Sequence, residues 1–469
     1  MDAPPKTQKL MEKLLSGAPT YRVEAIIDAK RMGRRAAPIV PYLIENLGDE
    51  DTVSIGQLAY GALDDLGESA VEPLIAALNV REYKGEKRRY ILFLLGEIGD
   101  HRAVPALSDA LGDSDEKIRY SAAQALLDMP DHRAFEPLMR HLQDSDNMVV
   151  SRAIAALGEI GDRRAVEPII PFLVKKRTWD QAGIRDAAAV ALGKFGDRRA
   201  FEPLLAAYED KEYPSKEYSD RALREYALQS LGRIKDPRAF DVLRRALKDK
   251  DADQRVAAVW GLAGLGDARS IALLKPMLKA ERSTEVWTKT PYWVIRVVRP
   301  AVARALVSTG GDDAIDAVFE EYRASPPTIE SEIAAGKMDS LKDVHFRTAA
   351  VDALAMSPNP RAYLKVIDTL DGADARMRYE AARVLYCSTI SQALSQIDVP
   401  GYDRRKLPAL ADNRVLRALM KVAESRPSPK QVSRSTFKML RETREYAISA
   451  LRKSGNPDAL KLVEKVEKE

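Results

Sequence analysis

The phrase GDRRAVEPI at residues 161–169 returns as GDRRAFEPL at 196–204, and this recurrence decides the fold of the chain. Further copies are GDHRAVPAL at 99–107, PDHRAFEPL at 130–138 and KDPRAFDVL at 235–243. The most regular copies lie about 31 residues apart, which leaves room for two helices and two turns. The period therefore predicts helix pairs that stack in chain order, each burying its apolar surface against its neighbours.

Glycine, aspartate and proline each have a local role in this phrase. The glycine follows an apolar helix, where a left-handed C-cap favours it, and the aspartate behind it is a good N-cap for the next helix. We expect these roles for Gly99, Gly161, Gly196 and Gly266 and for Asp100, Asp162, Asp197 and Asp267. The proline a few residues later must either kink the next helix or mark where its regular part begins, at Pro73, Pro137, Pro168 and Pro203.

The second helix of each pair is rich in small residues, as in SAAQALL at 121–127 and VAAVWGLAGLG at 256–266. Small side chains let neighbouring helices approach closely. An arginine stands seven residues before the last leucine of these helices, and an acidic turn precedes several of them. Stacking would bring each arginine near the aspartates of its own or the adjoining turn. We expect a structural ladder of hydrogen bonds from Arg88, Arg119, Arg185, Arg224, Arg255, Arg299, Arg347 and Arg378.

This order of phrase, acidic turn, arginine and alanine-rich helix resembles the HEAT repeat, in particular the bacterial and archaeal "PBS lyase HEAT-like" variety. The resemblance covers nearly the whole chain and is strongest at 67–280. It implies an all-α fold, a right-handed α-solenoid of about twelve helix pairs with a closing helix near 456–467. We expect N-terminal capping repeats at 1–66, regular repeats at 67–280 and divergent repeats with long loops at 281–469. The family includes chromophore lyases, assembly factors and regulatory adaptors, so the resemblance implies a fold more than a function.

Insertions interrupt the repeat at 175–183, 208–219, 280–292, 324–341, 388–411 and 425–434. Most of them join the proline-bearing helix to the alanine-rich helix, so they should line up along one edge of the stack. Exposed tryptophan and tyrosine are favoured interface anchors. Our leading hypothesis is a non-catalytic scaffold or adaptor that binds a protein partner through the concave face and this loop edge. In the alternative, the tryptophan and tyrosine rings of the insertions only pack the loops onto their own helices. The expected partner-binding residues are Trp179, Tyr213, Tyr218, Trp287, Tyr292, Trp293 and Tyr402.

A basic block follows in residues 400–453, where fourteen Lys and Arg stand against five Asp and Glu, a local charge of +9. Such a block favours an acidic protein, a nucleic-acid backbone or an anionic lipid, or is simply a solvated helix face. A nucleic-acid-binding protein is therefore our second hypothesis, although the whole chain carries a formal charge of only +4. The candidate residues are Arg404, Arg405, Lys406, Lys430, Arg434, Lys438 and Arg441.

Catalytic chemistry has little support in the sequence. It has no GxGxxG, Walker, GxSxG or CxxC motif, and no two of its four histidines have the i, i+4 spacing typical of a zinc site. A third hypothesis, a bilin lyase-type chromophore enzyme, rests on the family resemblance alone. The His-Glu pairs that carry iron in HEAT-repeat deoxyhypusine hydroxylase are absent, since Arg102, Arg133, Leu142 and Phe346 follow the histidines. We expect no catalytic residue, metal or cofactor.

Location is indicated only by what the sequence lacks. The single cysteine, Cys387, excludes an internal disulfide. The first residues do not read as a signal peptide, and no apolar run approaches the length of a membrane span. We therefore expect a cytoplasmic protein with no membrane span.

Overall fold

The computed structural model contains two compact units, Met1–Ala227 and Leu228–Glu469. The described residues are 5–48, 53–80, 83, 85–174, 182–210, 218–280, 285–287, 295–309, 311–324, 346–347, 349–354, 357, 359–370, 381–382, 420, 444–445, 447–449, 451–452 and 457–468.

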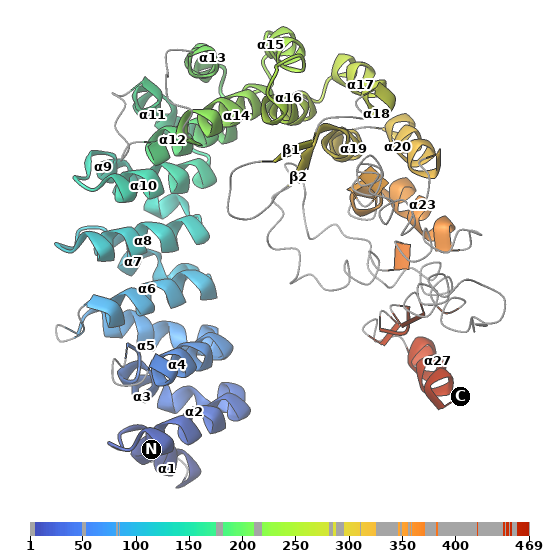
Figure 1. The fold of residues 1–469 in the computed structure, drawn as a ribbon. Helices are drawn as coiled ribbons and strands as arrows, with labels where there is room; N and C mark the ends of the chain where they lie inside the picture. Colours follow the sequence, from blue (N-terminus) through green and yellow to red (C-terminus); the bar gives the residue numbers. More distant parts are fainter. Residues whose placement is uncertain are drawn as a thin grey trace. The chain divides into compact units, whose positions relative to one another are not determined.

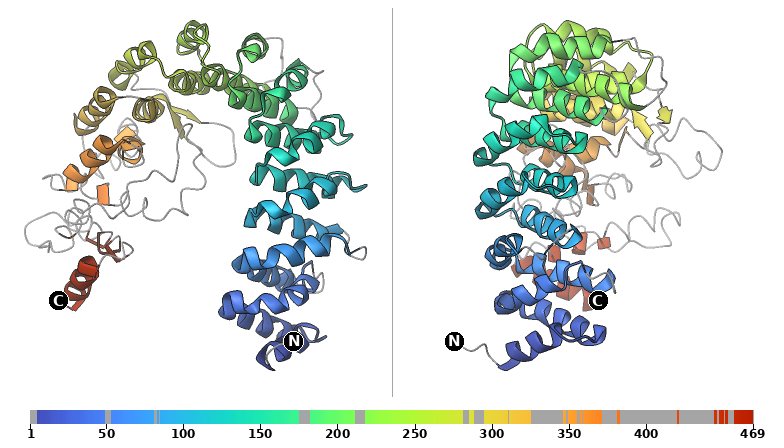
Figure 2. Two further views of the ribbon diagram at one scale, coloured as in Figure 1. Left: turned by 180° about the vertical axis from the view of Figure 1, so that it is seen from behind. Right: turned by 90° about the vertical axis from the view of Figure 1, so that its left-hand side faces the viewer.

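Helices stacked in chain order make up the first unit (Figure 1). One layer contains α2, α4, α6, α8, α10 and α12, each in contact with the next, and we call it the second-helix layer. The other layer, the first-helix layer, contains α3, α5, α7, α9, α11 and α13, and the two layers are seen from behind and from the side in Figure 2. The helices are α1 (Pro5–Leu14), α2 (Pro19–Met32), α3 (Val40–Glu45), α4 (Val53–Leu66), α5 (Glu68–Leu78), α6 (Gly85–Ile98), α7 (Val104–Ala110), α8 (Glu116–Asp128), α9 (Phe135–Arg140), α10 (Asn147–Ile160), α11 (Val166–Val174), α12 (Ala182–Phe195), α13 (Phe201–Glu209) and α14 (Tyr218–Arg233).

The second unit continues the alternation of helices from the end of α14. In it α15 contacts α16, α16 contacts α19, and α19 contacts α20. Its described elements are α15 (Ala239–Ala246), α16 (Ala252–Leu265), α17 (Ala268–Leu274), α18 (Met277–Ala280), β1 (Glu285–Trp287), β2 (Ile295–Val297), α19 (Val298–Thr309), α20 (Asp312–Ala324), α23 (Pro360–Leu370) and α27 (Pro457–Lys468). The last of these is the closing helix that the sequence predicted, and the all-α stack of helix pairs is confirmed.

One expectation for the insertions is wrong. The segment at 280–292 does not simply loop out, because β1 within it pairs with β2 as an antiparallel hairpin that contacts α16. Val286 lies opposite Arg296 in this pairing. The insertion at 208–219 is also shorter than expected, since α14 already begins at Tyr218.

Capping residues sit where the repeat phrase predicts them. Gly161 and Gly266 end α10 and α16 in the left-handed conformation, with φ of 75° and 66°. The carboxylates of the N-cap aspartates accept a hydrogen bond from a backbone N–H two or three residues further on. This holds for Asp100, Asp131, Asp162, Asp197 and Asp267.

The repeated prolines mark helix starts in three of the four expected cases. Short 3₁₀ turns at His132–Ala134, Arg163–Ala165 and Arg198–Ala200 lead into α9, α11 and α13. A proline then lies in the first turn of the α-helix, where its missing N–H has no partner to lose; these are Pro137, Pro168 and Pro203. Pro73 differs, because α5 runs through it.

Small residues allow the second-helix layer to pack closely, as expected from the sequence. A Cβ built on Gly96 of α6 would lie 2.8 Å from the Ala125 Cα of α8, and one on Gly158 of α10 would lie 2.8 Å from the Ala191 Cβ of α12. Both distances are too short for a real side chain. Larger residues here would push neighbouring repeats apart.

Lys235 tests the preference for glycine at left-handed helix C-caps. It has a φ of 54° and is exposed, at the position where other repeats have Gly99, Gly161 and Gly196. The left-handed conformation costs an L-residue about 1–2 kcal/mol. Glycine avoids this cost but loses more chain entropy on folding, so the net gain from glycine is smaller. We expect Lys235→Gly to stabilise α14 and α15 by about 1 kcal/mol, measured by hydrogen exchange in the full chain. Lys235→Ala keeps the strain and should not stabilise them; an equal gain from alanine would show that the side chain, not φ, is responsible.

Candidate protein-interaction surface

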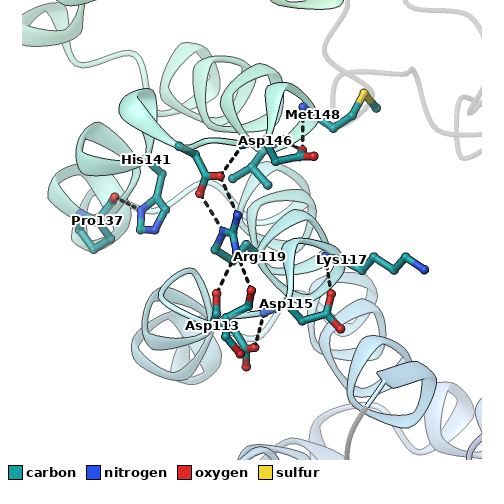
Figure 3. Close-up of polar contacts among 11 residues, drawn as sticks. Asp113, Asp115, Lys117, Arg119, Pro137, His141, Asp146 and Met148 are labelled. Carbon is teal, nitrogen blue, oxygen red and sulfur yellow. Dashed lines mark hydrogen bonds and ion pairs between the residues drawn. The ribbon is translucent and has the colours of Figure 1, made fainter. Parts of the chain in front are cut away.

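Arg119 of α8 joins two successive repeats through its guanidinium group (Figure 3). Nε and Nη2 each donate to one carboxylate oxygen of Asp144 in the next repeat, both at 2.8 Å. Nη1 donates to the carbonyl oxygens of Asp113 and Ser114 in its own acidic turn, at 3.0 and 3.2 Å. The Arg119 and Asp144 side chains are only 12% and 6% exposed. Little solvent screens this pair, so it holds the two turns together strongly.

Other ladder arginines have related contacts. Arg88 pairs with Asp113 of the next repeat at 3.4 Å. Arg185 donates to the carbonyl of Leu173 at 3.1 Å and lies 3.9 Å from the Asp210 carboxylate. Arg299 donates to the carbonyl of Leu278 at 2.7 Å and to Glu321 at 2.5 Å. Arg224 donates to the carbonyl of Tyr208 in α13, and Arg255 donates to the carbonyl of Asp249 in its own turn. Arg347 is 1% exposed, with its guanidinium 5.0 Å from the ring centre of Tyr322. Arg378 lies outside the described residues.

A second set of arginines, on the first-helix edge, was not foreseen from the sequence. Arg164 forms an ion pair with the N-cap carboxylate of Asp162 at 2.8 Å and a second one with Glu136 of the preceding repeat at 3.0 Å. The signal was present in the phrase itself, whose second arginine and Glu-Pro dipeptide recur one repeat apart. The matching sets are Arg102 with Asp100 and Glu72, and Arg199 with Asp197 and Glu167.

These contacts shift the acidity of the carboxyl groups. Hydrogen bonds from Arg102 lower the pKa of Asp100 to about 2, and those from Arg199 lower the pKa of Asp197 to about 2. Burial is the largest single influence on the pKa of Asp144 and acts to raise it, but the hydrogen bonds from Arg119 and the Asp146 backbone and the charge of Arg119 together lower that pKa. All three groups are therefore held as carboxylates down to acidic pH.

Two of the predicted partner-binding residues lie in described elements. Tyr218 is the first residue of α14 and Trp287 the last of β1. Nearby Tyr208 lies in α13 with the Arg224 guanidinium 5.2 Å from its ring centre, a contact within its own helix pair. The others lie outside the described residues: Trp179, Tyr213, Tyr292, Trp293, Tyr402 and the whole candidate basic set of Arg404, Arg405, Lys406, Lys430, Arg434, Lys438 and Arg441.

Aromatic side chains instead gather on the second-helix layer, on the surface formed by α4, α6, α8 and α10, which we call the α4–α10 face. Tyr60 of α4 and Tyr90 of α6 meet edge to face at 5.9 Å, and the Tyr60 hydroxyl donates to Glu97 at 2.6 Å. Tyr90 is 36% exposed and Met148 of α10 54% exposed. Rings and a methionine thus lie at the surface of consecutive repeats.

Tyr120 of α8 continues this row and is held by Arg152 of α10. Nε and Nη2 of Arg152 both donate to the Tyr120 hydroxyl at 3.2 Å, and the guanidinium carbon lies 5.4 Å from the ring centre. The sequence does contain a signal for these positions, because Tyr90 and Tyr120 stand two and one residues after a ladder arginine. Which side of the helix they occupy follows only from the packing.

Neither a metal cluster nor a membrane-crossing helix occurs in the part of the chain that the structure describes. No group of three His, Cys, Asp or Glu side chains there is arranged to hold an ion. No helix there is long and apolar enough to cross a bilayer.

Comparison with family models identifies the repeats. The model for HEAT repeats matches residues 71–156, 142–218 and 216–288, the region where the helix pairs and ladders are most regular. Residues 71–288 are HEAT repeats. A comparison of this chain with curated proteins found no match.

Solved structures with some likeness to this chain are all distant. The complex of CpcE and CpcF of phycocyanin lyase from Nostoc sp. is 23% identical over 33% of this chain and 98% of that one, with a TM-score of 0.29. Human deoxyhypusine hydroxylase is 17% identical over 55% and 96%, with a TM-score of 0.25. Yeast importin-β is 13% identical over 95% and 66%, with a TM-score of 0.43.

Removing Arg119 tests the buried ladder. Arg119→Met should lower the free energy of unfolding of α7–α10 by about 2–3 kcal/mol, because the buried Asp144 carboxylate and two carbonyls lose a charged donor. Hydrogen exchange in the full chain measures this. As a control, Arg140→Met alters an exposed arginine of α9 and should change stability by less than about 0.5 kcal/mol. Equal effects of the two changes would contradict a structural role for Arg119.

Acid pH tests the first-helix edge. Because the folded pKa of Asp197 is about 2, below the ordinary 3.8, its contribution to stability is fully present above pH 3.8 and is lost as the pH falls through 2. Arg199→Met should bring the pKa back toward 3.8 and make stability fall less steeply between pH 4 and pH 2. Urea unfolding followed by circular dichroism measures the slope, with Arg140→Met as the matched control. An unchanged slope in Arg199→Met would refute this role for the pair.

Proposed function

We propose that this protein is a non-catalytic scaffold or adaptor that holds a protein partner on the α4–α10 face. The observation that carries the proposal is the row of Tyr60, Tyr90, Tyr120 and Met148, presented at the surface by four successive helices. Tyrosine, methionine and arginine are enriched in protein interfaces. HEAT-repeat stacks typically serve as protein-interaction scaffolds, which agrees with this use of the face.

The contacts around the tyrosines favour binding. The hydroxyl of Tyr60 is fixed by Glu97 and that of Tyr120 by Arg152, so these rings lose little freedom when a partner arrives. Low ordering cost raises affinity for a given contact area. The loop-edge aromatics predicted from the sequence, such as Trp287, stay a separate prediction.

Site-specific photocrosslinking tests the proposal. With p-benzoyl-phenylalanine in place of Tyr90, irradiation in native lysate should give a covalent adduct with a discrete protein, because the ring at this position is exposed on the face. The same group in place of Arg140 on α9 is the control and should give no such adduct. Equal adducts at both positions, or none at Tyr90, would count against the proposal.

A further inference from the structure

Charge pairing on the second-helix layer has two exceptions. The helices α6, α8, α10 and α12 carry eight basic side chains, and six of them lie within ion-pair distance of a carboxylate. Among the described residues, Lys117 and Arg152 have no such carboxylate partner. The six pairs are Lys87–Glu45, Arg88–Asp113, Arg89–Glu86, Arg119–Asp144, Arg185–Asp210 and Lys194–Glu159.

The two exceptions are neighbours on the α4–α10 face. Lys117 lies on α8, three residues before Tyr120, and Arg152 lies on the adjacent α10, four residues after Met148. These spacings place each pair on one side of its helix. Figure 3 shows Lys117 and Met148 projecting to the same side, away from Arg119. We call Lys117, Tyr120, Met148 and Arg152 the Lys117–Arg152 patch.

Arg152 is already oriented for a ligand. Its Nε and Nη2 bind the Tyr120 hydroxyl, a neutral acceptor, while Nη1 has no acceptor among the described residues. A carboxylate is a stronger partner for a guanidinium than a hydroxyl is. Lys117 is exposed and adds a second positive charge. The patch therefore complements one or two carboxylates.

The surroundings limit what the anion can belong to. Toward the C-terminal ends of α6 and α8, the exposed acids Glu97 and Asp128 lie on the same layer. They would repel a long polyanion such as a nucleic acid, which also needs an extended basic track. Tyr120 and Met148 within the patch favour apolar contacts as well. A short segment with acidic and apolar side chains fits both features.

We propose that the Lys117–Arg152 patch binds an acidic peptide segment of a partner protein, with a carboxylate between Lys117 and Arg152 and a neighbouring apolar side chain on Tyr120 and Met148. This inference rests on the proposed function and specifies the chemistry of its partner. The partner's carboxylate forms ion pairs with these two cations, as the chain's own acids do with the other six.

Peptide binding to the full chain tests the inference. The probe is a short fluorescein-labelled peptide in which Glu alternates with Leu and Phe, and its counterpart has Lys at every Glu. Fluorescence anisotropy should show binding of the Glu peptide and none of the Lys peptide. Changing both Lys117→Met and Arg152→Met should weaken binding about tenfold or more, as for loss of a charge pair at an interface. Arg140→Met, with hydrogen exchange confirming that each variant is folded, should bind as the parent chain does.

Several outcomes would overturn it. Unaltered binding of the Glu peptide by the double variant would exclude the patch. Tighter binding of a mixed-sequence RNA oligonucleotide, or of phosphatidylserine vesicles, that is lost in the double variant would assign the patch to another anion. An adduct at Tyr90 without any Glu-peptide binding would sink the acidic-peptide inference and leave the scaffold proposal standing. Glu-peptide binding through the patch without an adduct would support the patch and remove Tyr90 from the binding surface.

Discussion

The described helix pairs bury their apolar surface against neighbouring repeats, and the rest of the structure depends on that constraint. Burial is achieved between successive repeats, where helices of the second-helix layer come so close that Gly96 faces the backbone of Ala125. Packing of this kind is sensitive to a single methyl group. The small residues that recur in these helices are therefore required by the neighbour and not by the helix itself. Stability is shared along the stack as a sum of nearest-neighbour contacts.

Close stacking brings the turns of adjacent repeats together, and two sets of arginines connect them. The Arg119 side chain is largely shielded from water, so its donors need protein acceptors, and it finds them in its own turn and in Asp144 of the next repeat. Arg164 is exposed, and a surface pair such as Arg164–Glu136 contributes little by itself. Its closer contact to Asp162 orders the cap that starts the next helix. The buried set stabilises the stack, whereas the exposed set mainly orders the junctions.

The α4–α10 face carries side chains that do not take part in the stacking of the repeats. The ladder arginines reach into the turns, whereas Tyr90 and Tyr120, one or two residues after a ladder arginine, are exposed or half-buried. Arg152 stands two residues after Val150, a position where the ladder has no arginine. Its guanidinium is held by a tyrosine hydroxyl instead of a carboxylate. A face built in this way combines fixed rings with unneutralised charge, the combination expected of a surface that selects a partner.

The repeat phrase by itself determined the helix pairs, the glycine and aspartate caps, and the HEAT-repeat fold, because these features depend on interactions within about thirty residues of chain. It left two roles open for prolines such as Pro137, a kink or a helix start, and the structure shows the start. Only the tertiary structure decided that Glu136 reaches Arg164, that Trp287 belongs to a hairpin, and that Lys117 and Arg152 flank Tyr120. The contacts of Glu136 with Arg164 and of Arg152 with Tyr120 join residues about one repeat apart, and they depend on how each helix is rotated about its axis when it packs. A one-dimensional period leaves that rotation open, and close packing against the neighbouring repeat sets it.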